Sequence, residues 1–131
     1  MPFLLLAGFF SAQVLGSLFL PITFAAIGDF GNNSPHESLV AALIERNAPD
    51  FIITLGDNNY PNGCKATLDN NVGKYFHAYI LNYQGSFGAG SLIQRFFPSL
   101  GNHDWRVLKK CPEQQSLPYF SYFDLPGNER Y

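Results

Sequence analysis

Three stretches of this chain place an oxygen-bearing side chain directly after a glycine that ends an apolar run. The stretches are FAAIGD, ending at Asp29, FIITLGD, ending at Asp57, and FFPSLGN, ending at Asn102. If the runs are neighbouring parallel strands, these side chains meet at one edge of the sheet, since neighbouring strands lie about 4.8 Å apart. Two carboxylates held so close repel each other unless a cation lies between them. Oxygen ligands suit a divalent or trivalent ion, so the pattern predicts a metal site.

Each of these side chains has a plainer interpretation when it is taken alone. Asp29 could cap a helix, Asp57-Asn58 could form an Asx turn, and Asn102-His103 could lie in a polar loop. The recurrence of one arrangement at three strand ends favours the metal site. A carboxylate between two cations could bridge metals about 3.5–4 Å apart, the geometry that serves in-line phosphoryl displacement.

The elements that would position these residues can be predicted from hydrophobic periodicity. The apolar runs Ile22–Ile27 and Phe51–Leu55 predict parallel strands that are buried on both faces. Between them, Ser34–Glu37 forms a capping box, and apolar residues at helical spacing predict a helix that stops before Pro49. Strand, helix and strand make a right-handed βαβ unit, and the fold class is α/β.

The second half of the chain carries weaker signals. Apolar residues between Val72 and Ile80 predict another amphipathic helix, on which His77 is interpreted as a helix-face histidine. The third strand is predicted at Phe96–Leu100, and Pro98 within it indicates an edge or a strand end. No internal repeat or domain linker is visible.

Composition limits the function classes. The chain has 131 residues, is 47% hydrophobic and carries a net charge of -2, which predicts one globular domain and argues against disorder. The low charge also argues against a nucleic-acid partner. No G-x-G-x-x-G follows the first strand, so dinucleotide binding is a weak alternative.

Residues 1–20 form an apolar leader, and residues 21–131 form the predicted domain. The leader is interpreted as a cleaved secretory signal, which predicts a secreted or extracytoplasmic protein, although no Lys or Arg precedes the apolar run. The alternatives are a retained membrane anchor and an ordinary buried segment or gene-model artefact. The oligomeric state cannot be predicted.

The two cysteines, Cys64 and Cys111, have no CxxC spacing, so they do not suggest a zinc site. In an exported protein they could pair and close a loop of about 48 residues, worth roughly 4 kcal/mol in the chain-entropy model. Two free thiols are the other possibility.

The sequences GDFG at Gly28, GDNNY at Gly56 and GNHD at Gly101 resemble the first three motifs of the calcineurin-like metallophosphoesterases. Most of that superfamily has Asp-x-His in the first motif, whereas position 31 is Gly here. The purple, or tartrate-resistant, acid phosphatase branch also lacks this His and uses a Tyr in the second motif, where Tyr60 stands. The PNG that follows Tyr60 and the LPGNERY tail add to this resemblance, which runs from Ile22 to the last residue.

The resemblance implies the N-terminal half of a four-layer αββα sandwich and a dinuclear metal centre. Asp29 and Tyr60 would bind the first metal, expected to be Fe(III), and Asp57 would bridge both metals. Asn102 would bind the second metal, a divalent Fe, Zn or Mn. A metal-bound hydroxide would then attack the phosphorus of a phosphomonoester.

The resemblance also implies two catalytic residues. His103 would contact the phosphate and protonate or stabilise the leaving group, and Asp104 would orient His103. The implied function is that of a metal-dependent phosphoric monoester hydrolase.

The family pattern requires more ligands than the chain contains. It expects a lone His and then Gly-His-x-His downstream, but no histidine follows His103. We therefore expect a truncated, incomplete enzyme that is inactive as this fragment. The alternatives are a half-protein completed by another chain and a degenerate relative, a non-catalytic module that binds phosphate or metal.

Overall fold

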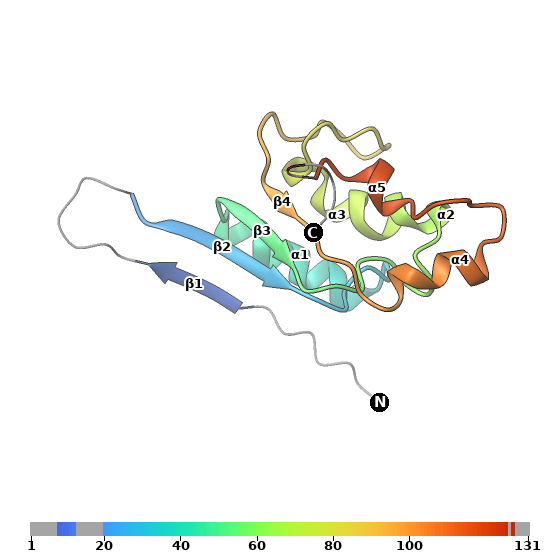
Figure 1. Ribbon diagram of the computed structural model, residues 1–131. Helices are drawn as coiled ribbons and strands as arrows, with labels where there is room; N and C mark the ends of the chain where they lie inside the picture. The colour runs from blue at the N-terminus through green and yellow to red at the C-terminus, as the bar shows by residue number, and fades with distance from the viewer. Residues whose placement is uncertain (1–7, 13–19, 126, 128–131) are drawn as a thin grey trace.

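The computed structural model describes residues 8–12, 20–125 and 127, and its centre is a sheet with the strand order β1-β2-β3-β4 (Figure 1). The strands are β1 (Gly8–Ala12), β2 (Ile22–Ile27), β3 (Phe51–Thr54) and β4 (Phe96–Phe97). β2, β3 and β4 run parallel, whereas β1 is antiparallel to β2. The predicted α/β class with a parallel sheet is confirmed.

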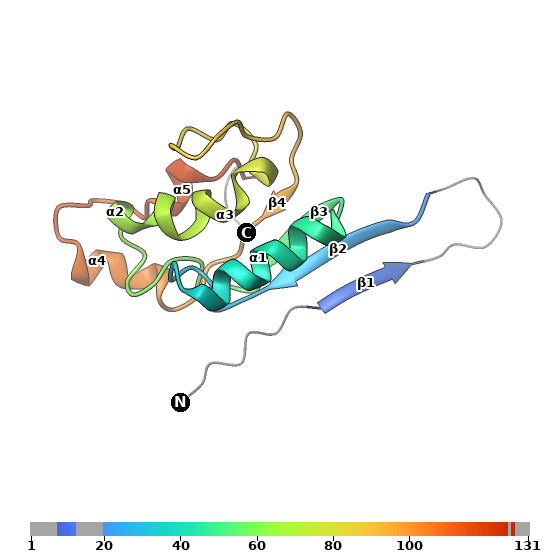
Figure 2. The same cartoon turned by 180° about the vertical axis from the view of Figure 1, so that it is seen from behind.

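The helices divide into one long element and several short ones. They are α1 (Pro35–Asn47), α2 (Lys65–Leu68), the π-helical η1 (Asp69–Gly73), α3 (Lys74–Phe76), the 3-10 turns η2 (His77–Tyr79) and η3 (Asp104–Arg106), α4 (Val107–Lys110) and α5 (Tyr119–Tyr122). Figure 2 shows α1 lying across β2 and β3, which makes β2-α1-β3 the predicted βαβ unit.

The two faces of the sheet differ. The side chains that point towards the helices are buried; they are Ala25, Ile27, Ile52, Thr54 and Phe96. On the opposite face Phe24, Phe51 and Phe97 are only half-buried. The Phe24 and Phe51 rings are stacked with centroids 5.4 Å apart, and the Phe97 ring meets Phe51 edge to face at 5.6 Å. The prediction of strands buried on both faces is therefore wrong for the described residues, because helices cover one face only.

Helix α1 begins and ends where the sequence predicts. The Ser34 side chain accepts a hydrogen bond from the Glu37 amide (3.2 Å), and Ala48, in the left-handed region (φ 44°), ends the helix before Pro49. The reciprocal half of the capping box differs from the prediction. The Glu37 carboxylate accepts from the amides of Asn32 and Asn33, and so holds the loop that follows β2.

The remaining elements depart further from the sequence predictions. The helix predicted over 72–80 is part of a longer helical region that begins at Lys65 and passes through the π-helical turn. β4 stops at Phe97, because Pro98 has no amide to donate to the ladder. β1 lies inside the predicted leader. The rest of the leader (1–7 and 13–19) and most of the LPGNERY tail (126 and 128–131) lie outside the described residues.

Candidate metal centre

Asp29 and Asp57 begin the loops that leave β2 and β3 at the same edge of the sheet. The Asp29 amide donates to the Gly56 carbonyl (3.2 Å), so the two loops start side by side. Both aspartates adopt the left-handed region (φ 55° and 53°), which Asp tolerates better than most residues. Gly101 lies in the third loop, which follows β4, and allows that loop to approach the second loop closely. A Cβ at Gly101 would lie 2.2 Å from the Asp57 amide nitrogen.

The hydroxyl of Tyr60 joins the two aspartates. It lies 2.9 Å from Asp29 Oδ1 and 3.1 Å from Asp57 Oδ2. A phenol carries one proton and can donate it to only one carboxylate at a time. The three oxygens, which we call the oxygen cluster (Asp29, Asp57 and Tyr60), therefore hold more acceptors than donors, an arrangement that a cation would complete.

The environment of the oxygen cluster keeps the phenol protonated when no metal is bound. Burial, followed by the hydrogen bond to Asp29 and the charges of both aspartates, raises the pKa of Tyr60 well above its ordinary value. The other oxygen of Asp57, Oδ1, accepts the backbone amide of His103 (2.7 Å). Asp57 thus connects the second loop to the third.

Gly31 explains why Tyr60 approaches the aspartates. A Cβ at position 31 would lie 1.7 Å from the carbonyl oxygen of Asn58, so the two backbones are too close for any side chain. The Tyr60 amide donates to the Gly31 carbonyl (2.7 Å), and this bond ties the second loop to the first. The close contact that excludes a histidine at position 31 also brings the phenol into the site.

Asn102, the remaining predicted ligand, is exposed, and its side chain makes no hydrogen bond with the part of the chain that the structure describes. Its amide oxygen is therefore available to a cation. The described residues contain no cluster of three or more His, Cys, Asp or Glu side chains that could hold a metal ion. A metal here would depend on a phenol and an amide in addition to the two carboxylates, and this oxygen-only set fits a hard ion.

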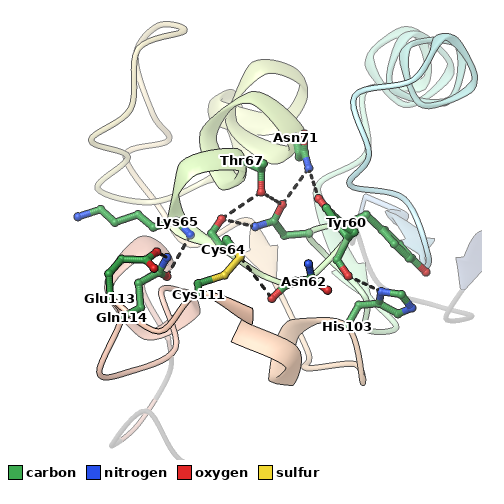
Figure 3. The surroundings of a disulfide bond; sticks show 12 residues. Tyr60, Asn62, Cys64, Lys65, Thr67, Asn71, His103, Cys111, Glu113 and Gln114 are labelled. Atoms are coloured by element: carbon green, nitrogen blue, oxygen red, sulfur yellow. Dashed lines mark hydrogen bonds between the residues drawn. A yellow bond between two sulfur atoms is a disulfide. The ribbon is translucent and has the colours of Figure 1, made fainter. Parts of the chain in front are cut away.

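His103 lies against the oxygen cluster, with its ring centroid 4.3 Å from that of Tyr60. Its Nδ1 is 2.7 Å from the Pro61 carbonyl oxygen (Figure 3) and 2.8 Å from Nη1 of Arg106. Its Nε2 makes no hydrogen bond with the described residues. Sequence reasoning did not single out Arg106, because an exposed arginine gives no signal of its own.

Asp104 is buried, and its carboxylate accepts a set of N–H groups from the neighbouring loops. The donors are the amides of Asn58, Asn59 and Gly101 and the side-chain amide of Asn58, at 2.9–3.2 Å. Burial still raises the pKa of Asp104, because these donors offset its desolvation only in part. We call this group the Asp104 network; the role of orienting His103 stays a prediction.

A disulfide between Cys64 and Cys111 fastens the second loop to the segment after His103, with the Cα atoms 6.0 Å apart (Figure 3). The Lys65 amide donates to the Gln114 side chain (3.1 Å) next to it. Of the two possibilities for the cysteines, the structure has the paired one.

His77, by contrast, is a helix-face histidine as predicted. Its Nδ1 lies 2.8 Å from the Ala89 carbonyl oxygen, and its ring packs against that of Tyr83, with centroids 5.7 Å apart. The structure therefore brings Asp29, Asp57, Tyr60 and His103 together and leaves His77 out.

The parallel strands β2, β3 and β4 are consistent with the N-terminal part of a metallophosphoesterase fold. The family model for the calcineurin-like phosphoesterases matches residues 22–130. The chain therefore belongs to the calcineurin-like phosphoesterase family.

Within the family, the chain is similar to purple acid phosphatases of Arabidopsis thaliana. It is 34% identical to purple acid phosphatase 17 and 33% identical to purple acid phosphatase 7, in each case over 90 residues that cover 65% of this chain and 25% of the relative. The chain thus spans about a quarter of the length of these relatives. No solved structure gives a significant match. No helix among the described residues is long and apolar enough to cross a membrane.

Proposed function

We propose that this chain supplies the first metal-binding loops of an acid phosphatase-like phosphoric monoester hydrolase with a dinuclear metal centre. The observation that carries the proposal is the single phenol proton shared between two carboxylates at the ends of parallel strands. The similarity to purple acid phosphatases supports it.

In this proposal Asp29 and Tyr60 would hold an Fe(III) ion, Asn102 would hold a divalent Fe, Zn or Mn ion, and Asp57 would be a ligand of both. When bound, the two metals supply Lewis-acid chemistry for attack on phosphorus. The chain's own residues orient the phosphomonoester. His103, next to the oxygen cluster, contacts the phosphate and stabilises the leaving group, and Asp104 fixes the loop that carries His103.

An iron titration tests the Tyr60 assignment. Fe(III) added to the chain should produce a visible phenolate-to-iron charge-transfer band, because a trivalent cation outweighs the charges that keep the phenol protonated. Tyr60→Phe should abolish the band. Tyr75→Phe is the matched control, since the Tyr75 hydroxyl bonds to Asn33 and not to the carboxylates. A colourless complex, or colour that survives Tyr60→Phe, would refute the assignment.

A non-catalytic module that binds metal or phosphate is the second candidate. It is favoured by the small donor set, in which the side chains of Asp29, Asp57, Tyr60 and Asn102 would serve two metals. Each metal would then have few fixed ligands, so we expect little hydrolysis of p-nitrophenyl phosphate by the chain with iron and zinc or manganese. Turnover at ordinary enzyme rates, roughly 1–1000 per second, would exclude this candidate.

We also propose that the protein is exported. Disulfides persist mainly in oxidising compartments, and the Cys64–Cys111 bond supports such a location. Cleavage of the 1–20 leader would remove β1, whose residues Gly8–Ala12 pair with β2. N-terminal sequencing of the mature protein distinguishes a cleaved signal from a retained strand. A start near residue 20 supports the signal, and retention of Gly8 supports β1 as a permanent strand.

A further inference from the structure

The Nδ1 atom of His103 has two neighbours with opposite hydrogen-bonding character. The Pro61 carbonyl oxygen, at 2.7 Å, can only accept, and Nη1 of Arg106, at 2.8 Å, can only donate. In a neutral imidazole, Nδ1 carries either a proton or a lone pair, so it can bond to one of these neighbours and not to both. The choice decides which ring nitrogen carries the proton.

We propose that Arg106 is a positioning residue that holds His103 as the tautomer with its proton on Nε2. Arg106 follows His103 by three residues and ends the 3-10 turn η3, in which its amide donates to the His103 carbonyl (3.1 Å). This turn brings the guanidinium to the His103 side chain, where Nη1 lies 2.8 Å from Nδ1. A guanidinium does not lose its proton, and a bond from a charged donor is about twice as strong as a neutral one. Pro61 is exposed, so water can satisfy its carbonyl in place of the ring.

A second histidine of the chain, His77, has only a hydrogen-bond acceptor next to its Nδ1 in the part of the chain that the structure describes. Nδ1 of His77 lies 2.8 Å from the Ala89 carbonyl oxygen, and no guanidinium bonds to it among the described residues. A carbonyl alone requires a proton on Nδ1. His77 and His103 should therefore be opposite tautomers, and Arg106 is the cause of the difference.

This inference rests on the proposed function for its consequence. With Arg106 bonded to Nδ1, Nε2 carries the N–H of a ring whose centroid lies 4.3 Å from that of Tyr60. A neutral Nε2–H gives up its proton reluctantly but donates a hydrogen bond well. His103 would then act on a phosphomonoester by donating a hydrogen bond to a phosphate or leaving-group oxygen, with no proton transfer from the ring.

Long-range 15N–1H correlation spectra of the metal-free chain test the tautomers. They are recorded at an alkaline pH at which both rings are neutral, and His103→Gln identifies the His103 signals. We expect Nε2–H at His103 and Nδ1–H at His77. Arg106→Met should convert His103 to Nδ1–H, and Arg106→Lys, which keeps a charged donor, should retain Nε2–H.

Arg46→Met, at an exposed arginine in the last turn of α1, is the matched control and should leave both tautomers unchanged. Arg106 is also exposed, so its replacement leaves the core intact. A wild-type His103 that matches His77, or a tautomer that Arg106→Met does not change, overturns the proposal. Because no metal or substrate is present, failure of the iron titration would remove the proposed function and leave this result standing.

Discussion

The oxygen cluster and the Asp104 network lie in the same loops, yet their hydrogen bonding is opposite. In the Asp104 network, one buried carboxylate receives N–H groups from three residues. In the oxygen cluster, two carboxylates share one phenol proton, and the only further donor among the described residues is the His103 amide, which bonds to Asp57. The protein satisfies the carboxylate that holds the loops together and leaves the other two short of donors. This difference separates a structural aspartate from a pair that is arranged for a cation, although all three follow or lie near a glycine at a strand end.

The disulfide links the two regions, and breaking it should have the largest effect on stability. Cys64→Ser with Cys111→Ser opens a loop whose ends are 47 residues apart. The chain-entropy model gives a loss of about 4 kcal/mol in the free energy of unfolding. Urea unfolding of the oxidised and reduced wild type and of the double variant measures it. Equal midpoints for all three would show that the bond contributes nothing.

Replacing Asp104 should disrupt the Asp104 network, in which the carboxylate is fully supplied with N–H donors. In Asp104→Asn, the new amide group faces the N–H donors of Asn58 and Gly101, and leaving such groups unpaired costs 1–3 kcal/mol each, so we expect a loss of about 3 kcal/mol. Thermal or urea unfolding of the metal-free chain is the measurement.

Asp29→Asn is the matched substitution in the oxygen cluster. It relieves repulsion in the oxygen cluster, so the metal-free chain should keep its stability or gain slightly, while Fe(III) binding weakens. If Asp29→Asn and Asp104→Asn destabilise the metal-free chain equally, the distinction between a structural Asp104 and an oxygen cluster arranged for a cation is wrong.

Glu37 is intermediate between the two regions, and its effect depends on pH. Its Oε2 accepts two amides, whereas its buried Oε1 has no hydrogen-bond partner among the residues that the structure describes. Burial, opposed by those amides and by the charge of Lys74, raises the pKa of Glu37 from 4.5 to about 7. Between these values the folded protein binds more protons than the unfolded chain. The contribution of Glu37 to stability is therefore greatest below about pH 4.5 and is lost as the pH rises to about 7, by about 3 kcal/mol at ~1.36 kcal/mol per unit.

Unfolding free energies measured between pH 4 and 8 test this slope. Glu37→Gln removes the titrating group and should flatten the profile, whereas Glu45→Gln, at an exposed position on the same helix, should leave it unchanged. A wild-type profile that rises with pH would contradict the assignment.

The elements that the sequence predicts well are those with a strong local signal. β2 and the ends of α1 agree with the prediction because an uninterrupted apolar run, an N-cap serine and a proline act within a few residues. The partial exposure of the sheet face that carries Phe24, Phe51 and Phe97 was not predicted, because the sequence of an apolar strand does not show whether a second layer covers it.

The site shows the same limit. The motifs predicted that Asp29, Asp57 and Tyr60 would gather, and the structure places them within hydrogen-bonding distance. The amide donors around Asp104 and the contact between Arg106 and His103 depend on how three loops pack, which no local pattern encodes. The cysteine pair could be proposed from sequence but not chosen over free thiols, since spacing alone does not fix a Cα–Cα distance.

The contact between Gly31 and Asn58 has a consequence for how such sites can change over evolution. A side chain at position 31 would need the second loop to withdraw, and that withdrawal would carry Tyr60 away from the aspartates. A ligand at position 31 and the Tyr60 ligand therefore exclude each other in this backbone arrangement. Exchanging one of these two ligands for the other during evolution requires either an intermediate whose site has neither ligand or simultaneous changes in both loops.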